Sequence, residues 1–389
     1  GIAGLNAAKA ARDQNPDCII TLIDSGDKNT YLRTRIPDYI AGIIGTKELF
    51  QYDDEWYKKN GINFIKNSTI SKINESNKTI TVGKESLPYD SLVLALGSSS
   101  FIPPIKGVEK QNVFAIRSFE DADKVKQAAG EGKTFTIIGG GLLGLEMSWA
   151  IKQTGANVNV IDNGPRLLSR QIDEQGAVLL YEAIKAKGIN IYLNAQTQEI
   201  SGNEKAESVK LADGTEIPSD VVILSTGVKA NLDLVKDCTI EIGRAIKVNE
   251  YMKTCSDGIF AAGDVAELNG KNFSIWPIAM AQGKVAGANA AGANKKYDEI
   301  SPHTQLKIKD ITMFSIGDIN SSADCKEFSL LDKDTKKYIK LFIKDNKITG
   351  AIVFGDPSLP MKIKKAVDIG VDVSLLGENT SIEDILKNI

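Results

Sequence analysis

Apolar runs separated by glycine turns predict strand–helix–strand units along this chain. In the most complete unit, residues 134–162, an apolar run leads into Gly139-x-Gly141-x-x-Gly144. A stretch rich in Ala, Leu and Met follows, and a second apolar run ends at Asp162. Apolar runs bounded by turns are typical of buried strands, and this glycine spacing is typical of a turn that opens a helix.

Residues 1–24 repeat the later part of this unit. Gly1 falls on the second glycine of the complete copy, Gly4 on the third and Asp24 on the terminal acid. The first strand and first glycine of the complete copy have no counterpart here, so we expect the sequence to be cut at its N-terminus. The repetition predicts two nucleotide-binding halves in one chain.

The residue types of both units suit an adenine dinucleotide. Glycines let the backbone approach a pyrophosphate, whose charge is stabilised by free N–H groups at a helix N-terminus. A carboxylate at the end of the second strand accepts hydrogen bonds from a ribose diol and repels a 2′-phosphate. Two ordinary βαβ turns with tight helix packing are the alternative interpretation of the same glycines.

Two later runs, 91–97 and 221–228, are predicted to be matching strands of the two halves. Both are apolar almost throughout, as strands buried on both faces are. They end at Gly97 and within a turn at Gly227, respectively. The two halves therefore look like duplicates of one another.

Another apolar strand, 258–262, is followed directly by Gly263 and Asp264. Open α/β sheets bind ligands beyond the carboxyl ends of their strands, so this acid is a candidate ligand contact. Residues 276–292 predict a helix of small residues that can lie close to backbone or to a flat ring. Tight packing alone is the alternative explanation of its small residues.

The remaining segments predict a helix near 47–60, a meander of short strands within 63–96 and a proline-containing linker at 101–107. The C-terminal part has a different pattern of predicted elements from the two halves before it, and it contains no glycine fingerprint. Its strands and its amphipathic helix are predicted at 337–344, 347–354 and 360–369. We interpret it as a compact α+β domain.

Bulk properties exclude several classes of protein. A length of 389 residues predicts two or three domains. A net charge of −3 gives no attraction to nucleic acid, and no basic stretch is interleaved with aromatic residues. No apolar run approaches the ~20 residues that span a bilayer, so we expect no membrane segment and a cytoplasmic protein.

The cysteines, Cys18, Cys238, Cys255 and Cys325, are far apart and form no C-x-x-C pair. They predict neither a metal site nor a redox disulfide between neighbours, and we expect them to be reduced and mostly buried. His303 is the single histidine, which excludes a His-rich metal site. We therefore expect no metal in this chain.

Several motifs together resemble the FAD-dependent pyridine nucleotide-disulfide oxidoreductase superfamily. They are the paired fingerprints at 1–24 and 134–162, the strand ends ALGS (95–98) and STGV (225–228), and AAGDVAE (261–267). Within the superfamily, YLRTRIPDYIAG (31–42), GGGLLGLEMSWAI (139–151) and LKIKDITMFSIGDI (306–319) resemble the NADH:rubredoxin oxidoreductases and the flavin part of nitrite reductases.

The resemblance implies an α/β fold with two Rossmann-like dinucleotide-binding domains and a small α+β C-terminal domain. The FAD domain would comprise 1–106 and 232–300, interrupted by an NAD domain at 107–231. The C-terminal domain would comprise 301–389.

The resemblance also implies the cofactors FAD and NADH and the residues that hold them. Asp264 would bind the FAD ribitol and Asp24 the adenosine ribose. The residues implied to contact FAD are Gly1, Gly4, Asp24, Arg33, Arg35, Leu96, Gly97, Ser98, Gly263, Asp264 and Trp276. Those implied to contact NADH are Gly139, Gly141, Leu142, Leu143, Gly144, Glu146, Asp162 and Gly227.

Structural roles are the alternatives for these side chains: Asp264 as a helix cap, and Asp24 and Asp162 as turn formers. The flavin itself is expected to carry the chemistry, with Glu146 and Arg35 as candidate catalytic side chains. Glu146 resembles an acid that some relatives pair with a cation near flavin N5, and an ordinary carboxylate near a helix N-terminus is its alternative.

One departure from part of the family bears on the chemistry. NADH oxidases, peroxidases and coenzyme A disulfide reductases carry a redox cysteine in the segment that resembles 31–42, and Thr34 stands at that position here. A hydroxyl forms neither a sulfenate nor a mixed disulfide. We therefore expect no redox-active cysteine, and electrons that leave directly from the flavin.

The resemblance implies an enzyme that takes a hydride from NADH and gives single electrons to a small iron protein such as rubredoxin. The alternatives are an NADH oxidase, a flavin component of a nitrite reductase-like system and a non-enzymatic flavin-binding protein. Rubredoxins are acidic, so a basic docking face is expected. The candidate lysines are Lys336, Lys337, Lys340, Lys362, Lys364 and Lys365, and a solvated surface of mixed charge is their alternative.

Overall fold

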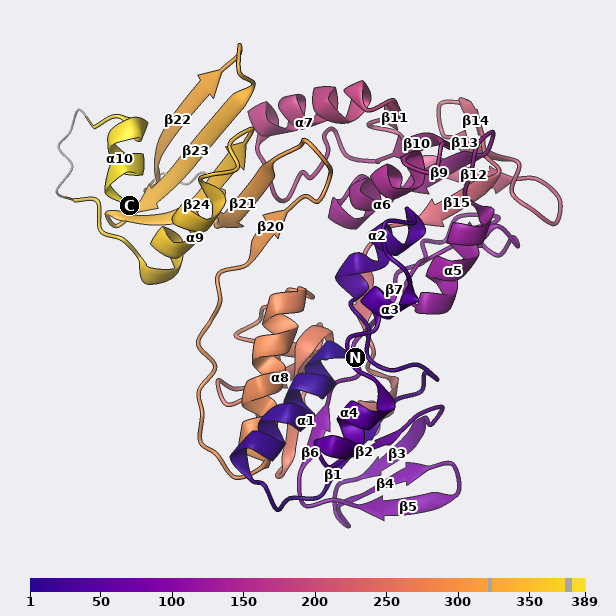
Figure 1. Ribbon diagram of the computed structural model, residues 1–389, viewed down its shortest axis with the longest axis vertical. Coiled ribbons are helices and arrows are strands. Elements are labelled where there is room, and N and C mark those ends of the chain that lie inside the picture. Colours follow the sequence, from indigo (N-terminus) through magenta and orange to yellow (C-terminus); the bar gives the residue numbers. More distant parts are fainter. Residues whose placement is uncertain (321–323, 375–379) are drawn as a thin grey trace. The chain divides into compact units, whose positions relative to one another are not determined.

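A computed structural model describes residues 1–320, 324–374 and 380–389 as two compact units (Figure 1). The first unit comprises Gly1–Ile36, Ile44–Ser99 and Val228–Glu299. The second comprises Pro37–Ile43, Ser100–Gly227 and Ile300–Ile389. Within the described residues, no helix combines the length and the hydropathy that crossing a bilayer requires.

The first unit carries the shorter glycine fingerprint. Its helix α1 (Ile2–Gln14) leads to strand β1 (Ile20–Ile23), which pairs in parallel with β2 (Ile62–Ile65). Strand β6 (Leu92–Leu94) pairs in parallel with β18 (Ile259–Ala261). The other elements are β3 (Ile70–Asn74), β4 (Thr79–Val82), β5 (Glu85–Pro88), β7 (Ser98–Ser100), β16 (Val228–Ala230), β17 (Ile246–Val248), β19 (Ala266–Leu268) and the 3-10 turns η1 (Arg33–Arg35), η2 (Asp233–Val235) and η3 (Gly263–Val265).

Helix α8 (Trp276–Ala290) lies directly against α1, and its glycines make that approach possible (Figure 1). A Cβ at Gly283 would lie 2.3 Å from the Ala3 carbonyl oxygen, and one at Gly287 would lie 2.0 Å from that of Ala7. Such distances are far below van der Waals contact, so only glycine fits. The small residues of the predicted helix therefore serve close packing on backbone.

The single helix predicted near 47–60 is wrong, because two short helices occupy this segment. They are α3 (Thr46–Leu49) and α4 (Asp54–Lys59). Phe50 between them is extended and forms a β-bridge with Tyr31. Asp53 then caps the second helix by accepting a hydrogen bond from the Trp56 N–H at 2.8 Å. A tertiary pairing and a new cap thus interrupt the helix.

The second unit is built on a parallel sheet with the order β11-β10-β9-β15-β8. Strand β15 (Val221–Leu224) is buried at every position, which confirms the prediction for this run. The other strands are β8 (Val113–Phe114), β9 (Thr134–Ile138), β10 (Asn157–Ile161) and β11 (Ile189–Tyr192). Around them lie α2 (Ile36–Ile40), α5 (Phe119–Ala128), α6 (Leu142–Lys152), α7 (Glu174–Ala186) and a small sheet of β12 (Thr197–Ser201), β13 (Ser208–Leu211) and β14 (Glu216–Pro218).

The C-terminal part of this unit is an antiparallel sheet with the order β20-β21-β24-β23-β22. Its strands are β20 (His303–Gln305), β21 (Met313–Gly317), β22 (Lys326–Asp332), β23 (Lys337–Lys344) and β24 (Lys347–Phe354). Helices α9 (Pro360–Ile369) and α10 (Ile382–Asn388) share its core. The α+β character predicted for this region is confirmed.

The glycine contacts between α1 and α8 predict the effect of one methyl group. We expect Gly287→Ala to lower the free energy of unfolding by about 1–3 kcal/mol, because its Cβ forces the two helices apart. Urea denaturation measures the change. Lys284→Ala, on the exposed face of the same helix, should change it by less than about 0.5 kcal/mol, and equal effects of the two variants would contradict the packing argument.

Candidate functional site

The glycine turn between β9 and α6 is built from two glycines that no other residue can replace without strain. Gly139 has a φ of +118°, and a Cβ there would lie 2.3 Å from the Ser225 carbonyl oxygen. A Cβ at Gly144 would lie 2.0 Å from the Gly139 carbonyl oxygen. The turn therefore closes on the end of β15 and on itself, as the fingerprint predicts.

Gly141 has a different role in this turn. It is the N-cap residue of α6, and no side chain caps the helix there. A Cβ at Gly141 would meet no atom of another part of the chain within 4 Å. The first turn contains no acidic residue, and Leu143 in it is exposed. An uncapped N-terminus with free N–H groups and open space before it fits a pyrophosphate.

Asp162 follows β10 at its carboxyl end and organises the loop around it. Its two carboxylate oxygens accept hydrogen bonds from the N–H groups of Gly140 and Gly164, both at 2.6 Å. The Gly140 bond ties the acid directly to the fingerprint turn. Asp162 is thus a turn former, and its remaining lone pairs can accept from a ribose diol.

Asp24 repeats this arrangement in the first unit. It follows β1, accepts a hydrogen bond from the Gly26 N–H at 2.9 Å, and lies 3.2 Å from the backbone nitrogen of Gly1. Gly1 is the N-cap of α1, which no side chain caps, and nothing lies within 4 Å of a Cβ there. The two units therefore present the same acid beside the same uncapped helix, which supports the duplication.

The strand ends of the first unit bring four predicted FAD residues together. The Ser98 hydroxyl donates to the Asp264 carboxylate at 2.6 Å. Gly97, with a φ of +67°, precedes this serine, and Gly263, with a φ of +79°, precedes the acid. Segments far apart in the sequence thus form one polar cluster at the carboxyl ends of β6 and β18.

Three polar residues that the sequence analysis did not identify hold this cluster in place. Asn231 donates through its side-chain amide to the Leu96 carbonyl at 2.8 Å, and Asn272 donates to the Asp264 carbonyl at 2.8 Å. Gln282 is buried in α8 and accepts from the Gly263 N–H at 2.9 Å. A buried amide within a helix of small residues was the signal that could have identified Gln282.

The segment that resembles the flavin-side loop of the family forms a 3-10 turn. Arg33, Thr34 and Arg35 make up η1, and all three side chains are half-buried. The Arg33 guanidinium lies 5.7 Å from the centre of the Tyr31 ring. Trp276 begins α8, whose N-terminus is also uncapped by any side chain.

Glu146 is a buried carboxylate in the second turn of α6, with a relative exposure of 5%. It accepts a hydrogen bond at 3.0 Å from the backbone N–H of Lys307, which belongs to the C-terminal part of the same unit. Burial raises the pKa of the Glu146 carboxyl above its ordinary value, and Asp38 adds to this, while Lys307 opposes it. The pairing of Glu146 with Arg35 stays a prediction.

Gly227 lies just beyond β15 with a φ of +98°, and its carbonyl accepts from the Phe101 N–H at 2.8 Å. A Cβ at Gly227 would meet nothing within 4 Å. There is therefore free space beside Gly227 just beyond β15, whereas the Gly139 backbone packs directly against Ser225.

All four cysteines are free thiols. Cys255 is exposed, and the other three are half-buried, so the expectation of mostly buried cysteines is met only in part. Over residues 1–320, 324–374 and 380–389, no cluster of three His, Cys, Asp or Glu side chains could hold a metal ion.

Most of the C-terminal lysines proposed as a docking face are engaged by other groups. Lys337 pairs with Asp356 at 3.1 Å, and Lys364 pairs with Asp368. The half-buried Lys340 pairs with Glu327 at 2.9 Å and with Asp173 at 3.4 Å, and Lys362 donates to the Leu386 carbonyl. These lysines fit the alternative of a surface of mixed charge.

Comparison with known proteins identifies the class to which these paired sites belong. Residues 1–283 match the family model of the pyridine nucleotide-disulphide oxidoreductases, and the chain belongs to this family. Residues 302–371 match the C-terminal domain of rubredoxin NAD+ reductase. Family membership implies FAD and NADH as cofactors and confirms the predicted fold class.

The particular relatives are similar over nearly the whole chain. The sequence is 37% identical to NADH-rubredoxin oxidoreductase of Clostridium acetobutylicum, over 100% of this chain and 97% of that protein. A crystal structure of the NADH:rubredoxin oxidoreductase from this organism matches with a TM-score of 0.82 over 100% and 97% of the two chains. The nitrite reductase [NAD(P)H] of Bacillus subtilis is 33% identical over 96% of this chain, which spans 47% of that protein.

The raised pKa of Glu146 predicts how its effect on stability changes with pH. The folded state holds this proton more tightly than the unfolded state, so the contribution to folding is complete below the unfolded pKa and is lost as pH rises through the raised pKa. Glu146→Gln keeps an acceptor for the Lys307 N–H without a charge. We expect its urea midpoint to rise relative to that of the parent as the pH increases above the ordinary pKa of Glu, about 4.3.

The control is Glu182→Gln, which changes an exposed carboxylate on α7 of the same unit. The difference between its urea midpoint and that of the parent should stay nearly constant as the pH changes. A Glu146→Gln difference that does not depend on pH would contradict the argument from burial.

Proposed function

We propose that this chain is an FAD-dependent NADH oxidoreductase that reduces a small iron protein of the rubredoxin class. The observation that carries the proposal is the similarity over nearly the full length of the NADH-rubredoxin oxidoreductase, C-terminal domain included. The two fingerprint sites in one chain support it, because hydride transfer between two coenzymes requires a binding site for each.

The residues of the second unit suit the binding of NADH. The α6 N-terminus at Gly141 would hold the pyrophosphate, and Asp162 would accept from the adenosine ribose. Gly139 and Gly144 let the turn close tightly enough to aim the N–H groups outward. The negative charge of Asp162 disfavours a 2′-phosphate, so we propose NADH rather than NADPH as the donor.

The residues of the first unit suit FAD in the same way. The N-terminus of α1 at Gly1 would hold its pyrophosphate, Asp24 its adenosine ribose, and the Ser98–Asp264 pair its ribitol. When bound, FAD supplies the chemistry of hydride acceptance and one-electron transfer. The chain itself binds and orients the coenzymes. The uncapped N-terminus of helix α8 would stabilise negative charge on the bound FAD.

We further propose that no cysteine takes part in electron transfer. Thr34 stands in η1 where parts of the family carry a redox cysteine, and a hydroxyl cannot be oxidised to a disulfide. The four thiols are scattered and none is paired with another. The cytoplasmic location and the domain boundaries at 106/107, 231/232 and 300/301 stay predictions.

The two equivalent acids give a matched pair of variants. We expect Asp162→Ala to raise the KM for NADH about tenfold, the size expected when a charged hydrogen-bond acceptor is removed, with bound flavin unchanged. Asp24→Ala should instead lower the flavin content and leave NADH binding intact. Steady-state kinetics and the flavin absorbance measure the two effects, and an unchanged KM in Asp162→Ala would refute the assigned role.

Anaerobic mixing tests the acceptor. We expect NADH to bleach the flavin, and rubredoxin to restore its absorbance faster than ferredoxin, nitrite or O2. Protein alkylated at its cysteines should react at the same rate, because no thiol carries electrons. If O2 reoxidises the flavin fastest, the protein is instead an NADH oxidase. If nitrite does so, it is a nitrite reductase component. If NADH does not bleach the flavin, the protein is a non-enzymatic flavoprotein.

A further inference from the structure

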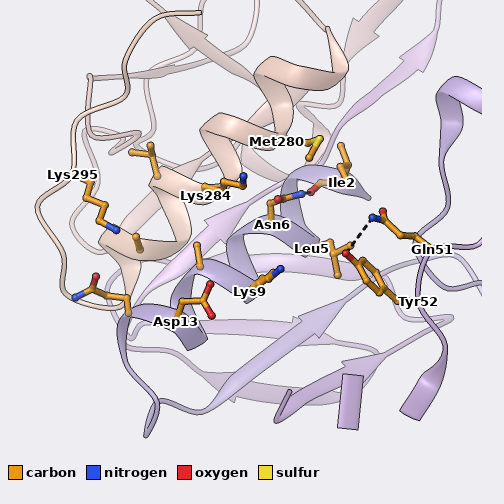
Figure 2. A pocket seen from close by; sticks show the side chains of 14 residues that line it. Ile2, Leu5, Asn6, Lys9, Asp13, Gln51, Tyr52, Met280, Lys284 and Lys295 are labelled. Atoms are coloured by element: carbon orange, nitrogen blue, oxygen red, sulfur yellow. Dashed lines mark hydrogen bonds between the residues drawn. The ribbon is translucent and has the colours of Figure 1, made fainter. Parts of the chain in front are cut away.

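A groove in the first unit brings together three lysines that have no acidic partner. Lys9 on α1, Lys284 on α8 and Lys295 on the loop after α8 surround the same opening (Figure 2). In the part of the chain that the structure describes, no carboxylate lies within 4.0 Å of their ammonium groups, unlike those of Lys337, Lys340 and Lys364. All three lysines are exposed.

The groove has a volume of about 490 Å³ and a lining of mixed polarity. Ile2, Leu5, Met280, Val285 and Ala288 on the two helices are its apolar lining residues, and Asn6, Gln14 and Gln51 are among its polar ones. The Tyr52 ring closes one end (Figure 2), and the Tyr52 hydroxyl accepts a hydrogen bond from the Gln51 amide at 3.1 Å. Asp13 is the single acid among the lining residues, so the groove carries a net positive charge.

The position of the third lysine is determined by the fold. The buried Asn289 accepts a hydrogen bond from the Lys295 N–H at 2.7 Å and donates to the Lys295 carbonyl at 2.8 Å. The loop therefore returns to the groove rather than continuing away from α8. The charges on α1 and α8 are positioned by the glycine contacts at Gly283 and Gly287, which allow the two helices to lie so close together.

We propose that this groove is the docking site for an acidic segment of the iron-protein partner, an inference that rests on the proposed function. Carboxylates of the partner would meet the three ammonium groups, and its apolar side chains would cover the wall between the helices. An apolar centre with a charged rim is the usual arrangement of a protein interface. The same two helices begin at the proposed FAD site, so a partner docked along them lies on the flavin-binding unit.

Electrostatic steering gives the proposal a measurable consequence. Complementary charge raises association rates by about 10–10³-fold at low ionic strength, and salt removes this gain because the Debye length is about 8 Å at physiological ionic strength. Reversing the charge of Lys9 and Lys284, on facing helices, should therefore slow the second-order reduction of the partner at least about tenfold at low salt. At high salt the rates should converge.

The test variant is Lys9→Glu with Lys284→Glu, and the matched control is Lys72→Glu with Lys84→Glu. The control makes the same change in net charge at exposed positions of the same unit that do not line the groove. Stopped-flow mixing of the prereduced protein with rubredoxin gives the rate for each. Equal rates for the two double variants over the range of ionic strength would overturn the proposal.

Two further measurements separate this proposal from the proposed function. Reduction of the flavin by NADH and turnover with ferricyanide should be unchanged in both double variants, because neither needs the groove. A parent protein that reduces ferricyanide but not rubredoxin would refute the proposed partner itself. Binding of inorganic pyrophosphate that is lost in the groove variant, together with unchanged rubredoxin kinetics, would identify a small-anion site and overturn the docking proposal.

Discussion

The close approach of backbone to backbone at glycine is the constraint on which both nucleotide sites depend. A pyrophosphate can be held by N–H groups only if the helix N-terminus is uncapped and the turn before it is tight. Gly144 against Gly139 meets this condition in the second unit. In the first unit, Gly283 and Gly287 let α8 lie on α1, which aligns two uncapped helices in one layer. A methyl group at any of these glycines would occupy the space that the neighbouring backbone fills.

Periodicity and glycine spacing predicted most of the elements, because strands buried in a sheet and helices that follow glycine turns have local signals. The helix near 47–60 failed, since the bridge between Phe50 and Tyr31 is a tertiary contact without a local signal. The position of Asp24 and Asp162 directly after a strand was also visible in the sequence, and their binding of ribose stays a prediction. Asn231, Asn272 and Gln282 were not, because their role is to satisfy backbone groups of segments distant in the sequence.

Charge was the property that the sequence predicted least well. A run of lysines in a sequence gives no information on which acids the fold brings near them. Lys340 is separated from Asp173 by 167 positions, yet the two pair because the C-terminal sheet packs near the N-terminus of α7. Asp173 also accepts from the Tyr338 hydroxyl and caps α7 through the Gly176 N–H. Such half-buried pairs position one part of the unit on another, and they leave little charge for a partner.

The absence of a redox thiol from the proposed route has a consequence for how a partner must bind. Electrons that pass directly from a flavin to a protein acceptor require a new encounter for every electron, so the complex must form quickly and separate quickly. Redox encounters of this kind have small interfaces, below about 1,200 Å². Charge contributes to the rate of encounter more than to affinity. A groove with three unpaired lysines and one aspartate meets this requirement, whereas a large apolar face would hold the oxidised protein and its product together.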